Sequence, residues 1–364
     1  MLNFQIGATD SRFRLATERI VGAFVFPEVW ANPSRFKTTL GALRECGVNA
    51  ILTESDAYDR TAIDAAHGFG LRFYAGLACF SDHASNFQTL AKRPELWPVL
   101  ESGERRAQME WYIGISPSDR RHQQEILAEI ALIARTYPID GLFLDFVRWP
   151  IHWEIELRPG RPRPRDSSFD ATTLAKFAEE TGFAPPPKVS TTARRAAWIH
   201  DRYFKEWVDF KCKVVTDFVG EARTFLKGAK SDAEFGVYVV PDVNGLTESL
   251  TGQRIRDLAP LVDWVSPMLY HNILLRPPSW IGDTLASFTP IAARKTLPVV
   301  QADSNRDSEL AADWGPPMSD ANWNATLAEI AMRTEIAGLV VFPGASIIAN
   351  SRGQALRSMV NKWR

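Results

Sequence analysis

The stretch Asp140-Gly-Leu-Phe-Leu-Asp-Phe-Val-Arg-Trp-Pro150 decides the fold. Residues 141–146 form a short run that is apolar at every position except Asp145. A continuous apolar run is typical of a strand that is buried on both faces, as in a parallel sheet. The stretch therefore predicts a parallel strand that ends in an acid.

Seven similar runs lie on either side of this strand, and segments with helical spacing separate them. A β-strand and a helix that alternate eight times are typical of a (β/α)₈ TIM barrel, here one domain over residues 1–364. A doubly wound open sheet is the alternative, but no GxGxxG turn is present. The eight expected strands are Ile20–Phe26, Val48–Thr53, Leu71–Ala78, Gly141–Phe146, Phe235–Val240, Val262–Leu269, Leu297–Gln301 and Gly338–Phe342.

The connections between these elements are unequal in length. Three long loops follow strands, after the third strand (80–117), the fourth (149–170) and the seventh (303–317). Long βα loops usually border a substrate cleft. The longest predicted helix is 193–226, where apolar residues recur every three or four positions.

Composition restricts the classes of partner. The chain has 42 basic and 43 acidic residues, a net charge of -1, so nothing points to nucleic acid or a membrane surface. Twelve tryptophans favour a carbohydrate partner, although many tryptophans simply fill cores. Three scattered cysteines predict neither a disulfide framework nor a zinc site. No signal peptide is visible, so we expect a cytoplasmic protein, or an exported one whose leader has been removed. Oligomeric state cannot be read from these features.

Polar residues at the carboxyl ends of barrel strands point into the active site. Metal-dependent hydrolases on this fold need clustered histidines, but no HxH pair occurs, and no GxSxG elbow supports a serine triad. We therefore expect neither a metal nor a cofactor. The candidates after the strands are Glu28, Trp30, Glu54, Asp145, Arg148, Trp149, Trp153, Tyr238, Asp242, Tyr270, His271, Gln301 and Asp303.

Asp145 is the strongest single candidate. A carboxylate in an apolar strand costs several kcal/mol unless it is paired, hydrogen-bonded or functional. Arg148 is a plausible partner that would keep it ionised; the alternative is a buried Asp–Arg pair that only shapes the barrel. Glycoside hydrolysis needs a second carboxyl group. We rank Asp303 first, Asp242 second and Glu54 third, and each of them could instead cap a helix.

The motif at 140–150 resembles the fourth-strand signature of a group of bacterial glycosyl hydrolase-like barrels. Residues 207–215 (Trp-Val-Asp-Phe-Lys-Cys-Lys-Val-Val) are similar to their helix before strand five, and residues 262–271 to their sixth strand. The matches span roughly residues 140–305. The resemblance implies a carbohydrate-active barrel, distantly like α-amylases and α-galactosidases, in which Asp145 takes the position of the nucleophile. This chain departs from both: it has Tyr238 and Asp242 where amylases carry an acid glutamate, and residues 268–271 where galactosidases carry an aspartate.

These observations predict hydrolysis of O-glycosidic bonds, with Asp145 as nucleophile or essential carboxylate and Asp303 or Asp242 as proton donor. Two rival functions remain, a barrel that binds sugar without cleaving it and a carbohydrate-active lyase. Glu28 and Glu54 border the expected site. We expect sugar hydroxyls to be bound by Arg148, Tyr238, Tyr270, His271 and Gln301, and sugar rings to stack on Trp30, Trp149 and Trp153.

Overall fold

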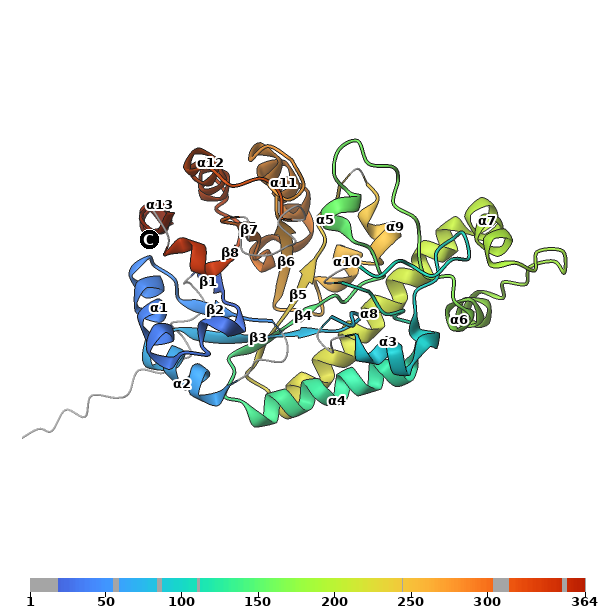
Figure 1. Cartoon of the computed structure of the whole chain (residues 1–364), viewed down its shortest axis with the longest axis horizontal. Coiled ribbons are helices and arrows are strands. Elements are labelled where there is room, and N and C mark those ends of the chain that lie inside the picture. The colour runs from blue at the N-terminus through green and yellow to red at the C-terminus, as the bar shows by residue number, and fades with distance from the viewer. Residues whose placement is uncertain are drawn as a thin grey trace, which may run out of the picture.

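The computed structural model describes residues 19–54, 59–83, 87–109, 112–243, 245–303, 314–348 and 352–363. Eight parallel strands close into a barrel in which each strand pairs with the next along the chain and β8 pairs with β1. The (β/α)₈ prediction is therefore confirmed (Figure 1). The strands are β1 Ile20–Phe24, β2 Ala50–Leu52, β3 Arg72–Ala78, β4 Gly141–Asp145, β5 Glu234–Val239, β6 Trp264–Leu269, β7 Val299–Gln301 and β8 Gly338–Phe342.

Helices cover the outside of the barrel. Several begin at side-chain caps: Asn32 accepts the Arg35 N–H, Asp119 the His122 N–H, and Ser319 the Asn322 N–H. The main covering helices are α1 Pro33–Glu45, α2 Arg60–Gly68, α4 Arg120–Thr136, α8 Phe204–Ala229, α11 Ser279–Ala292, α12 Asp320–Ala331 and α13 Arg352–Trp363. None of the helices in the described ranges is long and apolar enough to cross a membrane.

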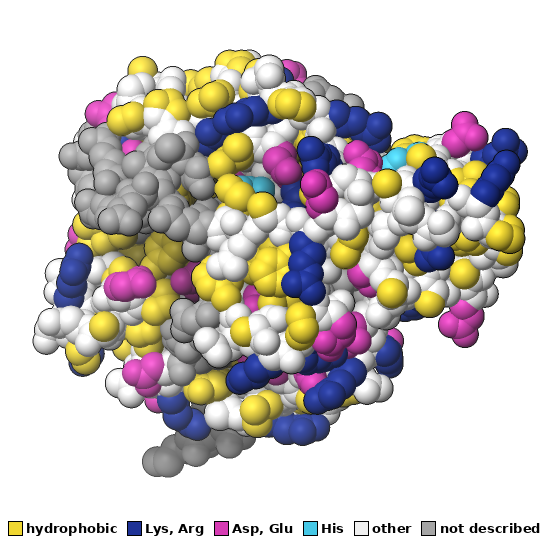
Figure 2. Space-filling view, turned by 45° about the vertical axis from the view of Figure 1, so that its right-hand side comes forward, with side chains coloured by type: hydrophobic (Ala, Val, Ile, Leu, Met, Phe, Trp, Pro, Cys, Tyr) yellow, Lys and Arg dark blue, Asp and Glu magenta, His cyan; other side chains and the backbone are white. Residues whose placement is uncertain are grey.

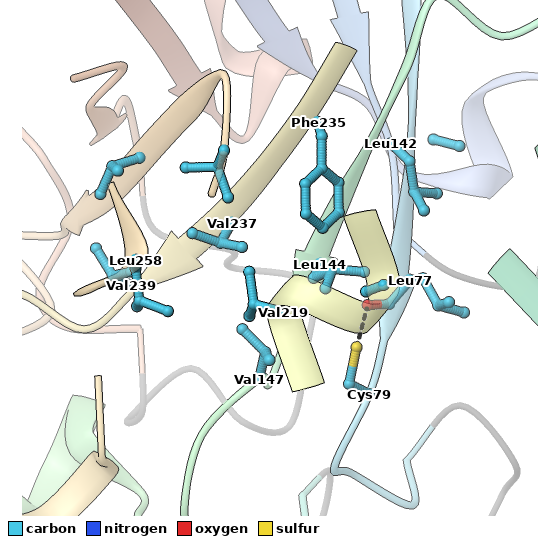
Figure 3. Close-up of a cluster of buried hydrophobic side chains, with 14 of the residues drawn as sticks. Leu77, Cys79, Leu142, Leu144, Val147, Val219, Phe235, Val237, Val239 and Leu258 are labelled. Carbon is cyan, nitrogen blue, oxygen red and sulfur yellow. Dashed lines mark hydrogen bonds between the residues drawn. The ribbon is translucent and has the colours of Figure 1, made fainter. Parts of the chain in front are cut away.

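Outward-facing side chains of the strands pack against these helices. Leu142 and Leu144 of β4 lie in one apolar cluster with Val237 of β5 and Val219 of α8 (Figure 3). Because side chains alternate along a strand, Phe143 and Asp145 face the barrel interior. The lower end of that interior is closed by polar side chains: Glu234 accepts hydrogen bonds from Tyr74 (2.6 Å) and Trp264 (2.8 Å).

The long helix predicted at 193–226 is two helices, α7 Thr192–Arg202 and α8. Tyr203 separates them with φ −135° and ψ 25°, outside the helical region. Helix α6 Ala171–Thr181 and α7 form a lobe that projects from the barrel (Figure 1), and acidic and basic side chains are interspersed over the visible face (Figure 2).

Backbone hydrogen bonds connect the segment after β3 to the segment after β4. The first holds α3 Gln88–Lys92 and the 3₁₀ turn η3 Pro94–Leu96, and the second holds α5 Trp153–Glu156. The Phe169 N–H donates to Val99 O (2.7 Å), and the Glu101 N–H donates to Asp166 O (3.1 Å). Of the loop expected after β7, residues 304–313 lie outside the described ranges.

A buried ion pair fastens the segment after β4 to the barrel wall. Lys211 of α8 donates to Asp166 (2.5 Å) and to the carbonyl oxygens of Ser249 (2.8 Å) and Leu250 (3.0 Å). Asp166 also accepts hydrogen bonds from Trp207 and His200. The segment that carries α5 therefore has a fixed position over the carboxyl ends of the strands.

Candidate active site

A small cavity lies at the carboxyl ends of the strands. Two carboxylates, Asp145 and Glu54, line it together. Active sites of barrel enzymes occupy this end. The other lining residues are Phe24, Thr53, Gly76, Leu77, Ala78, His83, Phe146 and Tyr238.

Asp145 is held by two neighbours. Its Oδ1 accepts the Phe146 N–H at 2.6 Å and lies 3.7 Å from Nη1 of Arg148. Its side chain is 28% exposed. Burial raises the pKa of Asp145, and the attraction of Arg148 and the hydrogen bond from Phe146 partly offset this rise. The expected Asp145–Arg148 pair is present, and the carboxylate still faces the cavity.

Phe146 adopts a left-handed backbone conformation, with φ 50°. A bulky residue in this region costs of order 1–3 kcal/mol, and such strain is concentrated at functional sites. Three groups hold the Phe146 ring: Tyr112 stacks on it (centroids 5.4 Å apart), His83 lies 4.8 Å away, and the Arg148 guanidinium lies 4.6 Å from its centroid. The strained residue thereby directs both its own N–H and the Asp145 carboxylate.

Arg148 is a buried cation with spare hydrogen-bonding capacity. Its side chain is 2% exposed, and Nε and Nη1 have no hydrogen-bond partner among the described residues. Buried donors are normally satisfied in proteins. Unsatisfied donors beside a cavity carboxylate are suited to bind an oxygen of a ligand.

His83, which we did not select from the sequence, also lines the cavity. Its Nδ1 lies 2.8 Å from Oγ of Ser81. Burial, and then the charge of Arg148, lower the pKa of His83 to about 4. A neutral imidazole can hydrogen-bond to a sugar hydroxyl. Because His83 lies five residues beyond β3, reading strand ends does not reveal it.

Glu154 of α5 is a second acid that sequence reasoning missed. Its side chain is 13% exposed. Burial raises the pKa of Glu154 to about 7; Arg148 opposes the rise and the charge of Asp145 adds to it. The only signal in the sequence is an acid between aromatic and apolar neighbours, in His152-Trp-Glu-Ile-Glu156, just after the strand-four motif.

An aromatic wall stands beside these acids. Trp153 stacks on Tyr270 (5.7 Å), Tyr270 on Phe342 (5.0 Å), and Phe342 on Trp314 (5.2 Å). Trp153, Tyr270 and Phe342 are buried, so this wall shapes the site and offers little open stacking surface.

The other expected binding residues are dispersed. Trp149 is buried against α8 and donates to the Lys211 carbonyl (3.0 Å). The Gln301 amide is used internally: it accepts the Ile273 N–H and donates to Asp303 O and Trp314 O. His271 is buried, and neither ring nitrogen has a hydrogen-bond partner within the described part of the chain. Near the end of β1, Glu28 is exposed and Trp30 is half-buried against Phe36 and Phe73.

The two highest-ranked partners of Asp145 do not line its cavity. Asp303 forms an ion pair with the buried Arg352 of α13. Asp242 is exposed, accepts the Thr247 N–H (3.3 Å) at the start of α9 Thr247–Thr251, and lines a separate groove on the outer surface. Glu54, ranked third, is the candidate that the structure brings to Asp145. Across the described ranges, no three His, Cys, Asp or Glu side chains are grouped so that they could hold a metal ion.

The fold and the acid-lined cavity define a (β/α)₈ barrel of the kind found in glycoside hydrolases. No family model matches the sequence, and no curated protein matches it. Among solved structures, the chain is similar to the glycoside hydrolase domain of PgaB (BpsB) from Bordetella bronchiseptica, with 15% identity, a TM-score of 0.70, and 94% of this chain and 99% of that chain covered.

Two further solved structures share the fold. The catalytic domain of β-amylase from Paenibacillus polymyxa has 12% identity and a TM-score of 0.62, with 96% of this chain and 99% of that chain covered. β-Galactosidase from Marinomonas ef1 has 12% identity and a TM-score of 0.62, and the match covers 94% of this chain and 59% of that one. At these identities the likeness establishes the fold.

Proposed function

We propose that this protein hydrolyses O-glycosidic bonds of an oligo- or polysaccharide, with Asp145 as the essential carboxylate. The observation that carries the proposal is the position of Asp145. It ends β4, lines a cavity that Glu54 also lines, and is paired with a buried arginine. Glycoside hydrolysis needs two carboxyl groups beside one bond, and the presence of two acids in one cavity supports the proposal.

Arg148 and the Phe146 N–H favour the ionised form of Asp145, which is the form that acts on the substrate. Ionised Asp145 either attacks the anomeric carbon or removes a proton from a water that does so. The first route retains the anomeric configuration and the second inverts it. The configuration of the first product, read by NMR, distinguishes the two routes.

Neutral polar groups around the cavity are suited to bind sugar hydroxyls. His83 and Tyr238 line it, and Arg148 has unsatisfied donors beside it. The aromatic wall of Trp153 and Tyr270 supplies the apolar side of the site.

The test is a screen of oligosaccharides and aryl glycosides with wild-type protein, followed by Asp145→Asn on any substrate found. The asparagine keeps the shape of the side chain and removes its charge. We expect kcat to fall by at least about a hundredfold, since losing an essential carboxylate costs several kcal/mol. If the variant kept more than about a tenth of wild-type kcat, the role of Asp145 would be wrong.

The screen also separates the rival functions. A barrel that only binds sugar gives saturable binding in calorimetry and no product. A lyase gives products without the added mass of water, which mass spectrometry detects.

A further inference from the structure

Helix α5 holds Glu154 in a rigid setting over the site. The neighbouring Glu156 accepts the His152 N–H (2.8 Å) and forms an ion pair with Arg106. The residue before Glu154, Trp153, is buried and stacks on Tyr270. Because both neighbours are anchored, the backbone that carries Glu154 is held in place.

Ionisable groups from four parts of the chain face Glu154. Arg148 and Asp145 come from the end of β4, and their charges act on its carboxyl group. Tyr112, before α4, and Tyr270, after β6, each feel the charge of Glu154.

Two groups on or beside its own helix complete this set, Glu156 and His152, whose Nε2 lies 3.9 Å from Oε2 of Glu154. That Oε2 is buried and accepts no hydrogen bond from any described residue. A carboxyl oxygen left without a donor is suited to carry a proton and give it to a ligand.

We infer that Glu154 is the proton donor to the leaving group in the hydrolysis centred on Asp145, an inference that rests on the proposed function. The Glu154 O–H bond breaks, and its proton passes to the glycosidic oxygen. That oxygen keeps the electron pair of the breaking C1–O bond. Asp145 forms a bond to C1, or takes a proton from the water that does. In the first route a water then gives its proton to Glu154 and its hydroxyl to C1, and the Asp145–C1 bond breaks. In the second route the proton on Asp145 passes through solvent to Glu154. Both routes consume one water and restore both acids.

The protonation states suit this division of roles. A general acid works best when its pKa lies near the working pH, while its partner stays ionised. The pKa of Glu154 is raised to about 7 by burial and by the charge of Asp145, whereas Asp145 has Arg148 at 3.7 Å. Asp145 also accepts the Phe146 N–H, which favours its ionised form, whereas Oε2 of Glu154 accepts no hydrogen bond from a described residue.

The other acids fit this role less well. Asp303 is paired with Arg352, and Asp242 caps α9 at the outer surface. Glu54 lines the same cavity as Asp145, whereas Glu154 does not, so Glu54 is the direct competitor and belongs in the test.

The experiment compares Glu154→Gln, Glu54→Gln and Glu156→Gln on two aryl glycosides of the sugar found in the screen. One carries dinitrophenolate, which leaves without a proton, and the other carries phenolate, which needs one. For E154Q we expect kcat/KM on the phenyl glycoside to fall by about 10²–10⁴-fold and on the dinitrophenyl glycoside by less than about tenfold. The decline of kcat/KM above about pH 7 should vanish as well.

Glu156→Gln is the matched control, because it changes an acid on the same helix that is bound to Arg106 and the His152 N–H. Because it keeps the Glu154 carboxyl group, it should lower the thermal midpoint and show a much smaller dependence on the leaving group than E154Q does. A second experiment adds azide to Glu154→Ala. This small anion can fill the space left by the missing side chain, and it speeds turnover of the dinitrophenyl substrate only if that space lies beside the reacting carbon.

The outcomes are separable. If the wild type is active and E154Q shows the same leaving-group dependence and pH profile as the wild type, Glu154 is not the donor. If E54Q alone shows the expected pattern, the role belongs to Glu54. A wild type inactive on every glycoside refutes the hydrolase proposal, and the role of Glu154 with it.

Discussion

Replacing Arg148 with methionine removes the cation that both acids share and keeps a side chain of similar length. The Arg148 Nη1 lies 3.7 Å from Asp145 Oδ1. At an effective dielectric constant of about 20, two unit charges at this distance attract by roughly 4 kcal/mol. Asp145 is 28% exposed, so water screens part of this attraction. Since Arg148 lowers the pKa of Asp145, we expect that pKa to rise in the variant.

The direction in which the pH profile moves follows from the effect of Arg148 on the pKa of each acid. Arg148 lowers the pKa of Asp145 and that of Glu154, so its loss raises both. Asp145 must be ionised and Glu154 protonated for turnover. The acid limb of the kcat/KM profile should therefore move to higher pH, and the basic limb should move to higher pH as well.

The assay measures kcat/KM for the phenyl glycoside between about pH 4 and pH 9. Arg148→Lys is the control, since it keeps the charge and loses the planar guanidinium; its limbs should stay close to those of the wild type. If the limbs of Arg148→Met coincide with those of the wild type while the protein remains folded by circular dichroism, Arg148 does not set the protonation states of the two acids.

Two further predictions concern buried residues that support the site. Lys211→Met should lower the free energy of unfolding in urea by about 3–5 kcal/mol, because it leaves the Asp166 carboxylate buried without its cation. The double variant Lys211→Met/Asp166→Asn should regain much of this loss, and equal stability of the two variants would contradict the reasoning. Trp149→Ala should cost about 3–5 kcal/mol of stability and leave KM unchanged at a temperature where it is folded; a large rise in KM would instead make Trp149 a sugar platform.

The strands and their closure were predictable because the information is local. Each strand is a short apolar run between turn signals, and a parallel barrel buries such runs on both faces. The position of Asp145 also follows locally, since the alternation within β4 turns Phe143 and Asp145 inward and Leu142 and Leu144 outward.

Beyond the strand ends that periodicity stops, and only the tertiary structure decides which way a side chain faces. Trp149 lies four residues past Asp145, and nothing local shows that it packs against Lys211. Asp303 is engaged by Arg352, which is 49 residues away in sequence.

Glu154 was missed for the same reason. It lies on a short helix within the segment after β4, and no strand pattern marks it. It faces Asp145 and Arg148 because the Asp166–Lys211 pair and the contacts of Glu156 fasten that segment over the barrel. The sequence alone determined the barrel and the acid at the end of β4, whereas the neighbours of that acid were decided by long-range packing, because contacts between distant segments leave no periodic trace.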